Sequence, residues 1–426
     1  MSPNLEVQAE SASLLEKDLG LEDRIPAVSS KPVKAISASS VSTSSIPTSS
    51  IATGQKRIAC FIPNLDGGGA ERVMIHLAEG FVEKGWAVDL VVTQVAGAYA
   101  KSLPETINLV NLQTGSPQVV NKTLALVRYF RRQQPDVFFT TLDIANVAAW
   151  ARWLSGTSSR VVMIVQINLT QQFCDLYSPM VRWLRSQVVK RFYPLADDIV
   201  AVSQGVAKDV ASMMNVETSQ IQVIYNPVIR SDLGDRAAEP VDHPWFDSPD
   251  VPVLLGVGRL VKQKDFATLV RAFAQVRAQR PCRLVIAGYV DEREADIKPD
   301  LERLIDKLGV SADVDFLGFV ENPYKYMARA QLLVLSSIYE GFGNVIVEAL
   351  AVGTPVVSTD CESGPAEILA DGKFGQLVPV GDRNALAAAI VDSLDNPLPT
   401  EVLKSRGRNF TIEESVRQYC DLVETY

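Results

Sequence analysis

The sequence predicts an α/β protein built from two doubly wound domains, and three observations carry this prediction. The chain has 426 residues, of which 47% are hydrophobic and 21% charged, so it can form two or three globular cores. Short continuous apolar runs alternate with amphipathic stretches, the pattern of parallel strands covered by helices on both faces. A polar segment rich in Pro and Asp, at 231–250, divides this pattern into two halves.

Composition excludes several classes of protein. No apolar run approaches the roughly 20 residues that span a bilayer, which excludes an integral membrane protein. The five cysteines are scattered and never form a CxxC pair, and only two histidines occur, which argues against disulfides and zinc sites. The net charge of -9 argues against nucleic-acid binding, although residues 57–230 carry 16 Lys and Arg against 13 Asp and Glu.

The first segment, 1–55, is expected to be a disordered tail. Thirteen of the 25 residues from Ser29 to Thr53 are Ser or Thr, too polar to offset the entropy of ordering. Neither a secretory signal nor a transit peptide is expected, because the apolar core of the former is missing and the start of the chain is rich in Asp and Glu.

The next segment, 56–230, is expected to be the first domain. Its apolar runs predict strands, and the first strand is followed by three glycines and an amphipathic helix. The predicted strands are 56–65, 88–95, 107–112, 136–142, 160–167, 198–203 and 221–228.

The second domain is expected at 251–408, after the linker at 231–250. A helix at 409–426 follows it and is a candidate to pack back on the first domain. Two such domains present a cleft between the carboxyl ends of their strands, where open α/β sheets bind ligands. The predicted strands of the second domain are 253–258, 283–290, 314–319, 332–337 and 355–360.

The stretch EGFGNVIVEALAVG, which begins at Glu340, predicts an anion site beside two acids. It follows an apolar strand and starts a helix near Asn344, where free backbone N–H groups and the helix dipole suit a diphosphate. Glu340 and Glu348 would repel the anion unless they accept hydrogen bonds from sugar and ribose hydroxyls. The amides that would hold the anion belong to Gly341, Phe342, Gly343, Asn344 and Val345.

Two further loops are expected at the cleft. Arg259 and Lys264 follow the first strand of the second domain and could neutralise a leaving diphosphate, although cations on surface loops are common. Gly67, Gly68 and Gly69 open the first helix of the first domain, where backbone can approach a ligand closely. An ordinary flexible loop is the competing interpretation of the three glycines.

Several other nucleotide and metal motifs are missing or incomplete. The stretch GVGRLV has Val261 in place of the third glycine of G-x-G-x-x-G, and no P-loop occurs, which argues against a dehydrogenase and a P-loop NTPase. Asp313 and Asp315 resemble a metal-binding pair but stand at the start of a strand, so we interpret them as structural. His76, inside a predicted helix, is also interpreted as structural, and no metal site is expected.

Together, the first glycine loop with GGGAER, the GR(x)4K spacing and the two acids of EGFGN resemble the retaining nucleotide-sugar glycosyltransferases of family four. The resemblance runs from about Lys56 to the end of the chain. It implies the GT-B fold, with two Rossmann-like domains facing across a cleft. It also implies that Glu340 binds the donor sugar, Glu348 the ribose, and Arg259 with Lys264 the diphosphate.

The resemblance places two more groups of residues. Val320 and Glu321, after the stretch FLGF, are implied to lie beside the base. Gln166 and Asn168 stand where many members carry a histidine that meets the donor sugar, so they are the corresponding candidates for a sugar contact. The chain also has Ala366 where relatives that extend oligosaccharides usually carry a basic residue.

The resemblance implies a retaining, metal-independent transfer from a nucleoside-diphosphate sugar, with a UDP-sugar expected, to a glycan or lipid-linked saccharide. The nucleotide-sugar is a co-substrate, and no resident cofactor is expected. Arg259, Lys264 and Glu340 are the candidate catalytic residues. Two alternatives stay open: a nucleotide-sugar epimerase of the same fold, and a non-catalytic protein that binds nucleotide-sugars.

A cytoplasmic protein is expected, and binding to the inner face of the membrane is a further hypothesis. The stretches 121–132 and 178–193 mix Trp, Phe and Val with basic residues, as do helices that lie on anionic bilayers. Covering helices with ordinary basic outer faces are the competing interpretation. The apolar residues of the second stretch are Val181, Trp183, Leu184, Val188, Val189 and Phe192, among Arg182, Arg185, Lys190 and Arg191.

Overall fold

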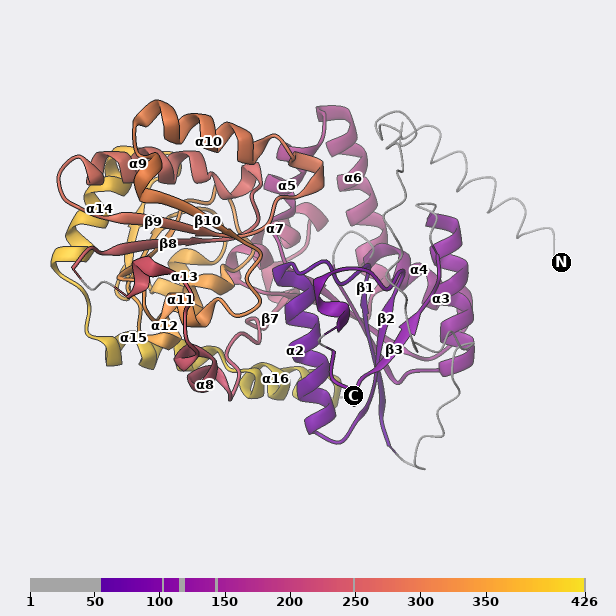
Figure 1. The fold of residues 1–426 in the computed structure, drawn as a ribbon. Coiled ribbons are helices and arrows are strands. Elements are labelled where there is room, and N and C mark those ends of the chain that lie inside the picture. The colour runs from indigo at the N-terminus through magenta and orange to yellow at the C-terminus, as the bar shows by residue number, and fades with distance from the viewer. Residues whose placement is uncertain (1–54, 102, 115–118, 142–144, 248–249, 425–426) are drawn as a thin grey trace, which may run out of the picture.

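The computed structural model describes residues 55–101, 103–114, 119–141, 145–247 and 250–424. Within them the chain forms two parallel sheets side by side, each lying between layers of helices (Figure 1). The α/β class with two doubly wound domains is therefore confirmed. Residues 1–54 of the predicted tail lie outside the described residues.

The first sheet has the strand order β3-β2-β1-β4-β5-β6-β7, and all its neighbours pair in parallel. Its central strands are completely buried, because helices cover both faces. The strands are β1 (Arg57–Ile62), β2 (Ala87–Val92), β3 (Asn108–Asn111), β4 (Val137–Thr141), β5 (Arg160–Val165), β6 (Asp198–Ala201) and β7 (Gln222–Val223). The helices are α2 (Gly69–Glu83), α3 (Val119–Gln133), α4 (Ala145–Ser155), α5 (Leu169–Leu176), α6 (Pro179–Phe192) and α7 (Gln204–Met214).

The second sheet has the order β10-β9-β8-β11-β12-β13 and is also parallel throughout. The strands are β8 (Val253–Val257), β9 (Arg283–Ala287), β10 (Val314–Gly318), β11 (Leu332–Leu335), β12 (Val356–Thr359) and β13 (Gln376–Val378). The helices are α9 (Phe266–Arg277), α10 (Ile297–Leu308), α11 (Tyr324–Met327), α12 (Asn344–Val352), α13 (Pro365–Leu369), α14 (Arg383–Asp395) and α15 (Thr400–Gly407).

Three elements differ from the sequence expectations. Strand β13 was not predicted, since its three residues form too short a run to show a period. Strand β7 is shorter than the predicted 221–228, because the chain leaves the sheet toward the second domain after Val223. The linker region contains a short helix, α8 (Leu233–Ala238), which contacts α11 and α12.

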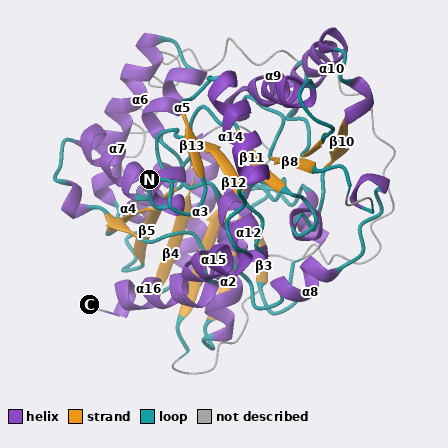
Figure 2. Ribbon diagram, turned by 90° about the vertical axis from the view of Figure 1, so that its left-hand side faces the viewer, coloured by secondary structure: helices purple, strands orange, loops and turns teal. Residues whose placement is uncertain are grey.

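The chain returns to its first half in the last helix, α16 (Ile412–Glu424). This helix lies beside α2 (Figures 1 and 2). The Tyr419 ring meets Phe139 of β4 edge-on, with the ring centroids 5.5 Å apart. Gly80 allows the contact, because a Cβ there would lie 2.4 Å from the Val416 side chain. The linker and α16 therefore both connect the second domain to the first.

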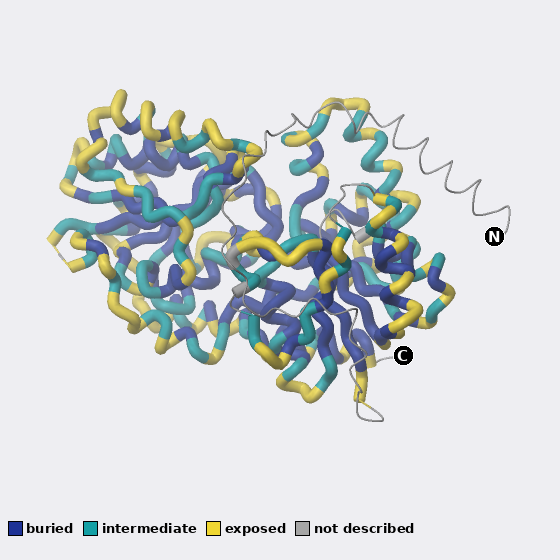
Figure 3. The backbone as a smooth tube through the Cα atoms, turned by 45° about the vertical axis from the view of Figure 1, so that its right-hand side comes forward, coloured by how far each residue is buried: buried dark blue, intermediate teal, exposed yellow. Residues whose placement is uncertain are grey.

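One cluster of buried hydrophobic residues extends from the first domain into the second, and buried segments of both domains are dark blue in Figure 3. Tyr225, at the end of the first domain, stacks on Phe342 with ring centroids 5.4 Å apart, and Phe410 meets both rings edge-on. Polar contacts reinforce this apolar junction, since Glu367 accepts hydrogen bonds from the amides of Gln204 and Gly205 at 2.8 and 2.9 Å. The junction sets the distance between the facing edges of the sheets.

Candidate active site

Glu340 lies on the loop between β11 and α12, at the carboxyl end of the second sheet. Its side chain is buried, and its Oε1 atom accepts a hydrogen bond from Ser337 Oγ at 2.6 Å. Lys264 Nζ lies 2.5 Å from the same oxygen. A buried carboxylate needs such partners because its desolvation is costly when it is unpaired. The structure thus brings together two residues that the sequence predicted for one site.

Lys264 and Arg259 both lie on the loop that follows β8. Lys264 is mostly buried, with 15% of its side chain exposed, whereas 36% of the Arg259 side chain is exposed. Arg259 Nη1 lies 3.1 Å from Asp291 Oδ2, and Arg293 binds the same carboxylate. Hydrogen bonds from Arg293 are the main cause that lowers the pKa of Asp291 to about 2, so this anion stays charged and orients Arg259.

The backbone amides of 341–345, in the stretch after Glu340, are neighbouring hydrogen-bond donors without an acceptor among the described residues. Helix α12 begins at Asn344, and Gly343 before it has φ of 98°, a left-handed conformation that glycine adopts without strain. Within the described residues, the N–H groups of 341–345 donate no hydrogen bond to the protein. Since 341–343 are buried, these donors suit an anion at the helix N-terminus.

The first domain approaches this loop very closely. A Cβ on Gly341 would lie 1.9 Å from the carbonyl oxygen of Gln166, and Ser203 Oγ donates to the Gly341 carbonyl at 2.7 Å. The side-chain Nε2 of Gln166 is buried and has no hydrogen-bond partner in the described part of the chain. Gln166, whose backbone lies against Gly341, therefore keeps a side-chain amide without a partner among the described residues.

Asn168 lies near Gln166, but its polar atoms are already engaged. Its Oδ1 atom accepts from the Gln171 amide and caps α5, while Nδ2 lies 3.2 Å from Glu362 and 3.3 Å from Ser363 of the second domain. These contacts join the two domains. Of the two candidates for a sugar contact, Gln166 alone keeps unused donors.

Glu348 lies one turn into α12, and only 1% of its side chain is exposed. Its Oε1 atom pairs with Arg72 of α2, in the first domain. Its Oε2 atom has no hydrogen-bond partner among the described residues. Burial raises the pKa of Glu348, and the charge of Arg72 opposes this increase.

The loop of Gly67, Gly68 and Gly69 follows β1 and faces the second domain. Gly67 has φ of 103°, so this position favours glycine. Burial raises the pKa values of Asp66 and Glu71 on either side, and the charges of Arg293 and Arg259 in the second domain oppose this increase at both residues. The glycine loop therefore lies close to the basic loop after β8.

Val320 and Glu321 line a separate cavity of about 600 Å³. It lies between the end of β10 and the linker, and its wall includes Arg236, whose Nη2 donates to the Glu321 carbonyl at 3.3 Å. None of Arg259, Lys264 and Glu340 lines this cavity. The structure thus places the predicted base residues apart from the basic pair.

Each residue interpreted as structural has a partner within the protein. Asp313 binds Arg277 at 2.7 Å, and Asp315 lies 3.0 Å from His243. His76 is buried with Nδ1 2.8 Å from the Pro227 carbonyl, and burial lowers its pKa to about 3. No group of three or more His, Cys, Asp and Glu among the described residues could hold a metal ion.

Sequence reasoning missed Arg72, Ser337 and Asp291. Arg72 stands within the quoted GGGAER stretch, and its place in the first turn after a strand was a signal that it faces the cleft. Ser337 ends the predicted strand 332–337 before Glu340, where the same reasoning applies. Asp291 follows the predicted strand 283–290 directly, so it gave the same signal, but its pairing with Arg259, 32 residues earlier, gave none.

Two family models match the chain in succession. The model of Glycosyltransferase Family 4 matches residues 67–231, and that of Glycosyl transferases group 1 matches residues 243–410. The chain therefore belongs to the group 1 glycosyltransferases with the GT-B fold. It is a glycosyltransferase, as the resemblance of its motifs implied.

Individual relatives and solved structures agree with this assignment. The chain is 29% identical over 369 residues to a Campylobacter jejuni protein, N-acetylgalactosamine-N,N'-diacetylbacillosaminyl-diphospho-undecaprenol 4-alpha-N-acetylgalactosaminyltransferase, covering 83% of this chain and 94% of that one. It is 29% identical over 355 residues to the lipopolysaccharide core biosynthesis glycosyltransferase LpsE of Rhizobium meliloti, covering 82% and 93%. The structure of Anabaena HepE with UDP and glucose has the same fold, with a TM-score of 0.70, 21% identity and coverage of 87% and 100%.

Proposed function

We propose that the protein transfers a sugar, with retention of configuration, from a nucleoside-diphosphate sugar to a saccharide carried on a lipid. The observation that carries this proposal is the Lys264–Glu340 pair beside the unused amides of 341–345. A cation, a carboxylate and a set of amide donors together suit a sugar diphosphate. The names of the relatives support a lipid-linked or lipopolysaccharide acceptor, and the bound UDP of HepE supports a UDP-sugar.

The donor would lie along the edge of the second sheet. Arg259, Lys264 and the amides of 341–345 would hold the diphosphate, and Glu340 would accept hydrogen bonds from the sugar hydroxyls. The unused oxygen of Glu348 would accept from the ribose, since a buried carboxylate oxygen without a donor suits a hydroxyl. The base would extend toward Val320 and Glu321.

The transfer is proposed to proceed on one face of the sugar. The acceptor oxygen bonds to the anomeric carbon as the bond to the diphosphate breaks, and a leaving phosphate oxygen takes the acceptor's proton. Lys264 and Arg259 stabilise the negative charge that develops on the leaving group. Glu340 is not a nucleophile in this scheme: it accepts hydrogen bonds from the sugar hydroxyls, while Lys264 and Ser337 hold its Oε1 atom.

Two alternative functions are separable from this proposal. An epimerase of the same fold would convert its nucleotide-sugar without an acceptor, and membership of a glycosyltransferase family argues against it. A non-catalytic binding protein would hold the donor without consuming it. The ion pair of Lys264 with Glu340 favours a catalytic site over a site that only binds the donor.

Thermal unfolding with a panel of nucleotide-sugars tests the donor site. A ligand that binds only the folded protein raises its stability, by about 2.7 kcal/mol at a concentration 100 times the Kd. We expect UDP and at least one UDP-sugar to raise the Tm, and free monosaccharides to leave it unchanged. A Tm that no nucleotide-sugar changes would contradict the proposal.

Replacing Glu348 by alanine should weaken binding of the nucleoside diphosphate. The ribose hydroxyls would lose an acceptor in a buried site, at a cost of about 1–3 kcal/mol. Calorimetric titration with UDP measures the change. Glu302→Ala, on the exposed face of α10, is the matched control, and unchanged affinity in a folded Glu348→Ala protein would remove Glu348 from the donor site.

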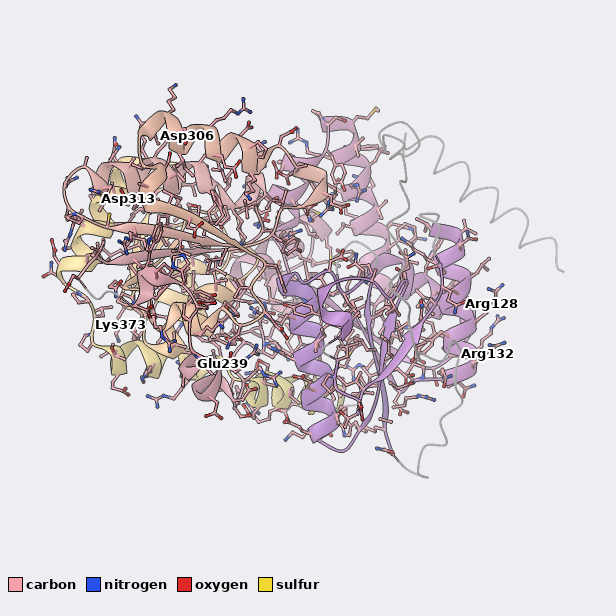
Figure 4. The ribbon with its side chains drawn as sticks, in the orientation of Figure 1. Arg128, Arg132, Glu239, Asp306, Asp313 and Lys373 are labelled. Carbon is pink, nitrogen blue, oxygen red and sulfur yellow. The ribbon has the colours of Figure 1, made fainter. Side chains whose placement is uncertain are left out.

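We also propose that helix α6 binds an anionic membrane surface. Met180 and Trp183 expose 68% and 60% of their surface, whereas Val189 is buried in the domain and Phe192 packs on Trp150 of α4. Of the apolar residues predicted for this helix, Val189 therefore lies in the core and Trp183 at the surface. Basic residues accompany the exposed face, and Arg128 and Arg132 project from α3 on the same domain (Figure 4). No helix in the described ranges combines the length and apolar character needed to cross a bilayer.

Vesicle cosedimentation tests this surface. The protein should sediment with anionic vesicles at low salt and less at high salt, since each cation near the lipid contributes about 1 kcal/mol. Changing Arg182, Arg185, Lys190 and Arg191 to Gln should abolish sedimentation, whereas Arg303→Gln with Lys307→Gln on α10 should not. Wild-type protein that stays in the supernatant at low salt would contradict the hypothesis.

A further inference from the structure

We propose that Arg72 of the first domain is a positioning residue that completes the ribose site on the second domain. This inference rests on the proposed nucleotide-sugar donor, and in particular on Glu348 as its ribose acceptor.

The position of Arg72 follows from the local fold of the first domain. Strand β1 ends at the cleft, the three glycines turn the chain, and Arg72 falls in the first turn of α2. From there it pairs with Glu348, 276 residues further along the chain. Only 20% of the Arg72 side chain is exposed, so water screens this ion pair little.

Arg72 favours the ionised form of Glu348. Burial raises its pKa, and Arg72 is the largest influence that lowers it. The other charged or titratable groups coupled to Glu348 are Arg236 of α8, Tyr324 of α11 and Tyr99 of the first domain. Of these, Arg236 alone adds positive charge, and its Nη2 atom donates to the Glu321 carbonyl.

The ion pair leaves one carboxylate oxygen for the ligand. Arg72 occupies Oε1, while Oε2 is buried without a partner among the described residues. A charged carboxylate accepts at both oxygens, whereas a protonated one becomes a donor at one of them. Arg72 thus both orients Glu348 and keeps it an acceptor toward the ribose.

Neighbouring contacts show that the same edge of the first domain reaches α12. Asn226 Nδ2 donates to Asn344 Oδ1 at 2.9 Å, and a Cβ on Gly69 would lie 3.5 Å from Asn344 Nδ2. The glycine loop therefore lies against the start of α12, one turn before Glu348. Separation of the domains would remove Arg72 from Glu348 and the loop from the helix together.

Calorimetric titration of Arg72→Met with UDP, from about pH 6 to pH 9, tests the inference. We expect affinity about 10- to 100-fold below wild type at neutral pH, because the carboxylate loses its counterion. Without Arg72 the pKa of Glu348 rises further, so the deficit should be largest at low pH and shrink as the pH rises. A merely structural role would weaken binding equally at every pH.

Three variants complete the experiment. Arg72→Lys keeps the charge and should restore part of the affinity, while Arg303→Met, whose side chain is 77% exposed on α10, should match wild type. Arg72→Met with Glu348→Gln removes both charges and should fold even if the single variant does not, yet bind UDP without the pH dependence. If wild type binds UDP and Arg72→Met binds it equally across the range, the inference is overturned. If wild type binds no nucleoside diphosphate, the proposed function fails instead.

Discussion

Lys264→Ala and Arg259→Ala should each lower the turnover number about 100- to 1000-fold, the usual effect of removing one group that stabilises developing charge. In the proposed transfer the diphosphate gains negative charge as its bond to the sugar breaks, and these two cations lie at the edge where it departs. Steady-state rates with saturating donor and acceptor measure the effect.

The two variants should differ in their effect on stability. Lys264 is mostly buried and pairs with Glu340 at 2.5 Å, so its loss leaves a buried carboxylate whose remaining side-chain partner in the described part of the chain is Ser337. Arg259 is more exposed, and Asp291 keeps Arg293 when it is removed. We therefore expect Lys264→Ala to lower the Tm and Arg259→Ala to leave it nearly unchanged. Lys307→Ala, on the exposed face of α10, should match wild type in both rate and Tm. A loss of turnover below tenfold in both active-site variants would mean that the loop does not contact the leaving group.

Gly341→Ala should reduce activity about 100-fold, although it adds a single methyl group. Its Cβ would lie 1.9 Å from the Gln166 carbonyl oxygen and 2.8 Å from the Ile167 Cα, so the backbone of one domain must shift. A displacement of about 1 Å between reacting groups can cost on the order of 100-fold in rate. Turnover and the radius of gyration from small-angle scattering together measure the effect.

The matched control for this variant is Gly234→Ala. Gly234 lies in α8, and a Cβ there would meet no atom within 4 Å. We expect Gly234→Ala to keep the wild-type rate and radius, and Gly341→Ala to show a larger radius with a lower rate. A fully active Gly341→Ala protein would show that turnover does not require the close approach of Gln166 and Gly341.

Much of the fold could be predicted from local patterns in the sequence. Most strands of both sheets lie in apolar runs whose order along the chain alternates with helices, and this alternation implies parallel pairing. The loops that carry Glu340 and Lys264 could also be predicted, because each follows a strand directly and carboxyl ends of parallel strands share one edge.

Contacts between the domains could not be predicted in the same way. Arg72 and Glu348 each belong to a helix whose local pattern is satisfied without the other, and neither pattern records the angle between the two sheets. The same holds for Gly341 and Gln166, whose contact depends on how Tyr225, Phe342 and Phe410 pack at the junction. Such contacts arise from the packing of whole domains, which the period of a strand or helix does not encode.

The central claim is tested most directly by release of nucleoside diphosphate from a donor sugar with and without a lipid-linked saccharide. If the protein is a glycosyltransferase of the proposed kind, release should require the acceptor and equal the amount of sugar joined to it, with the anomeric configuration retained. Conversion of the donor without acceptor would indicate an epimerase. Binding of the donor with no release under either condition would show that the site holds a nucleotide-sugar without transferring it, and would contradict the account.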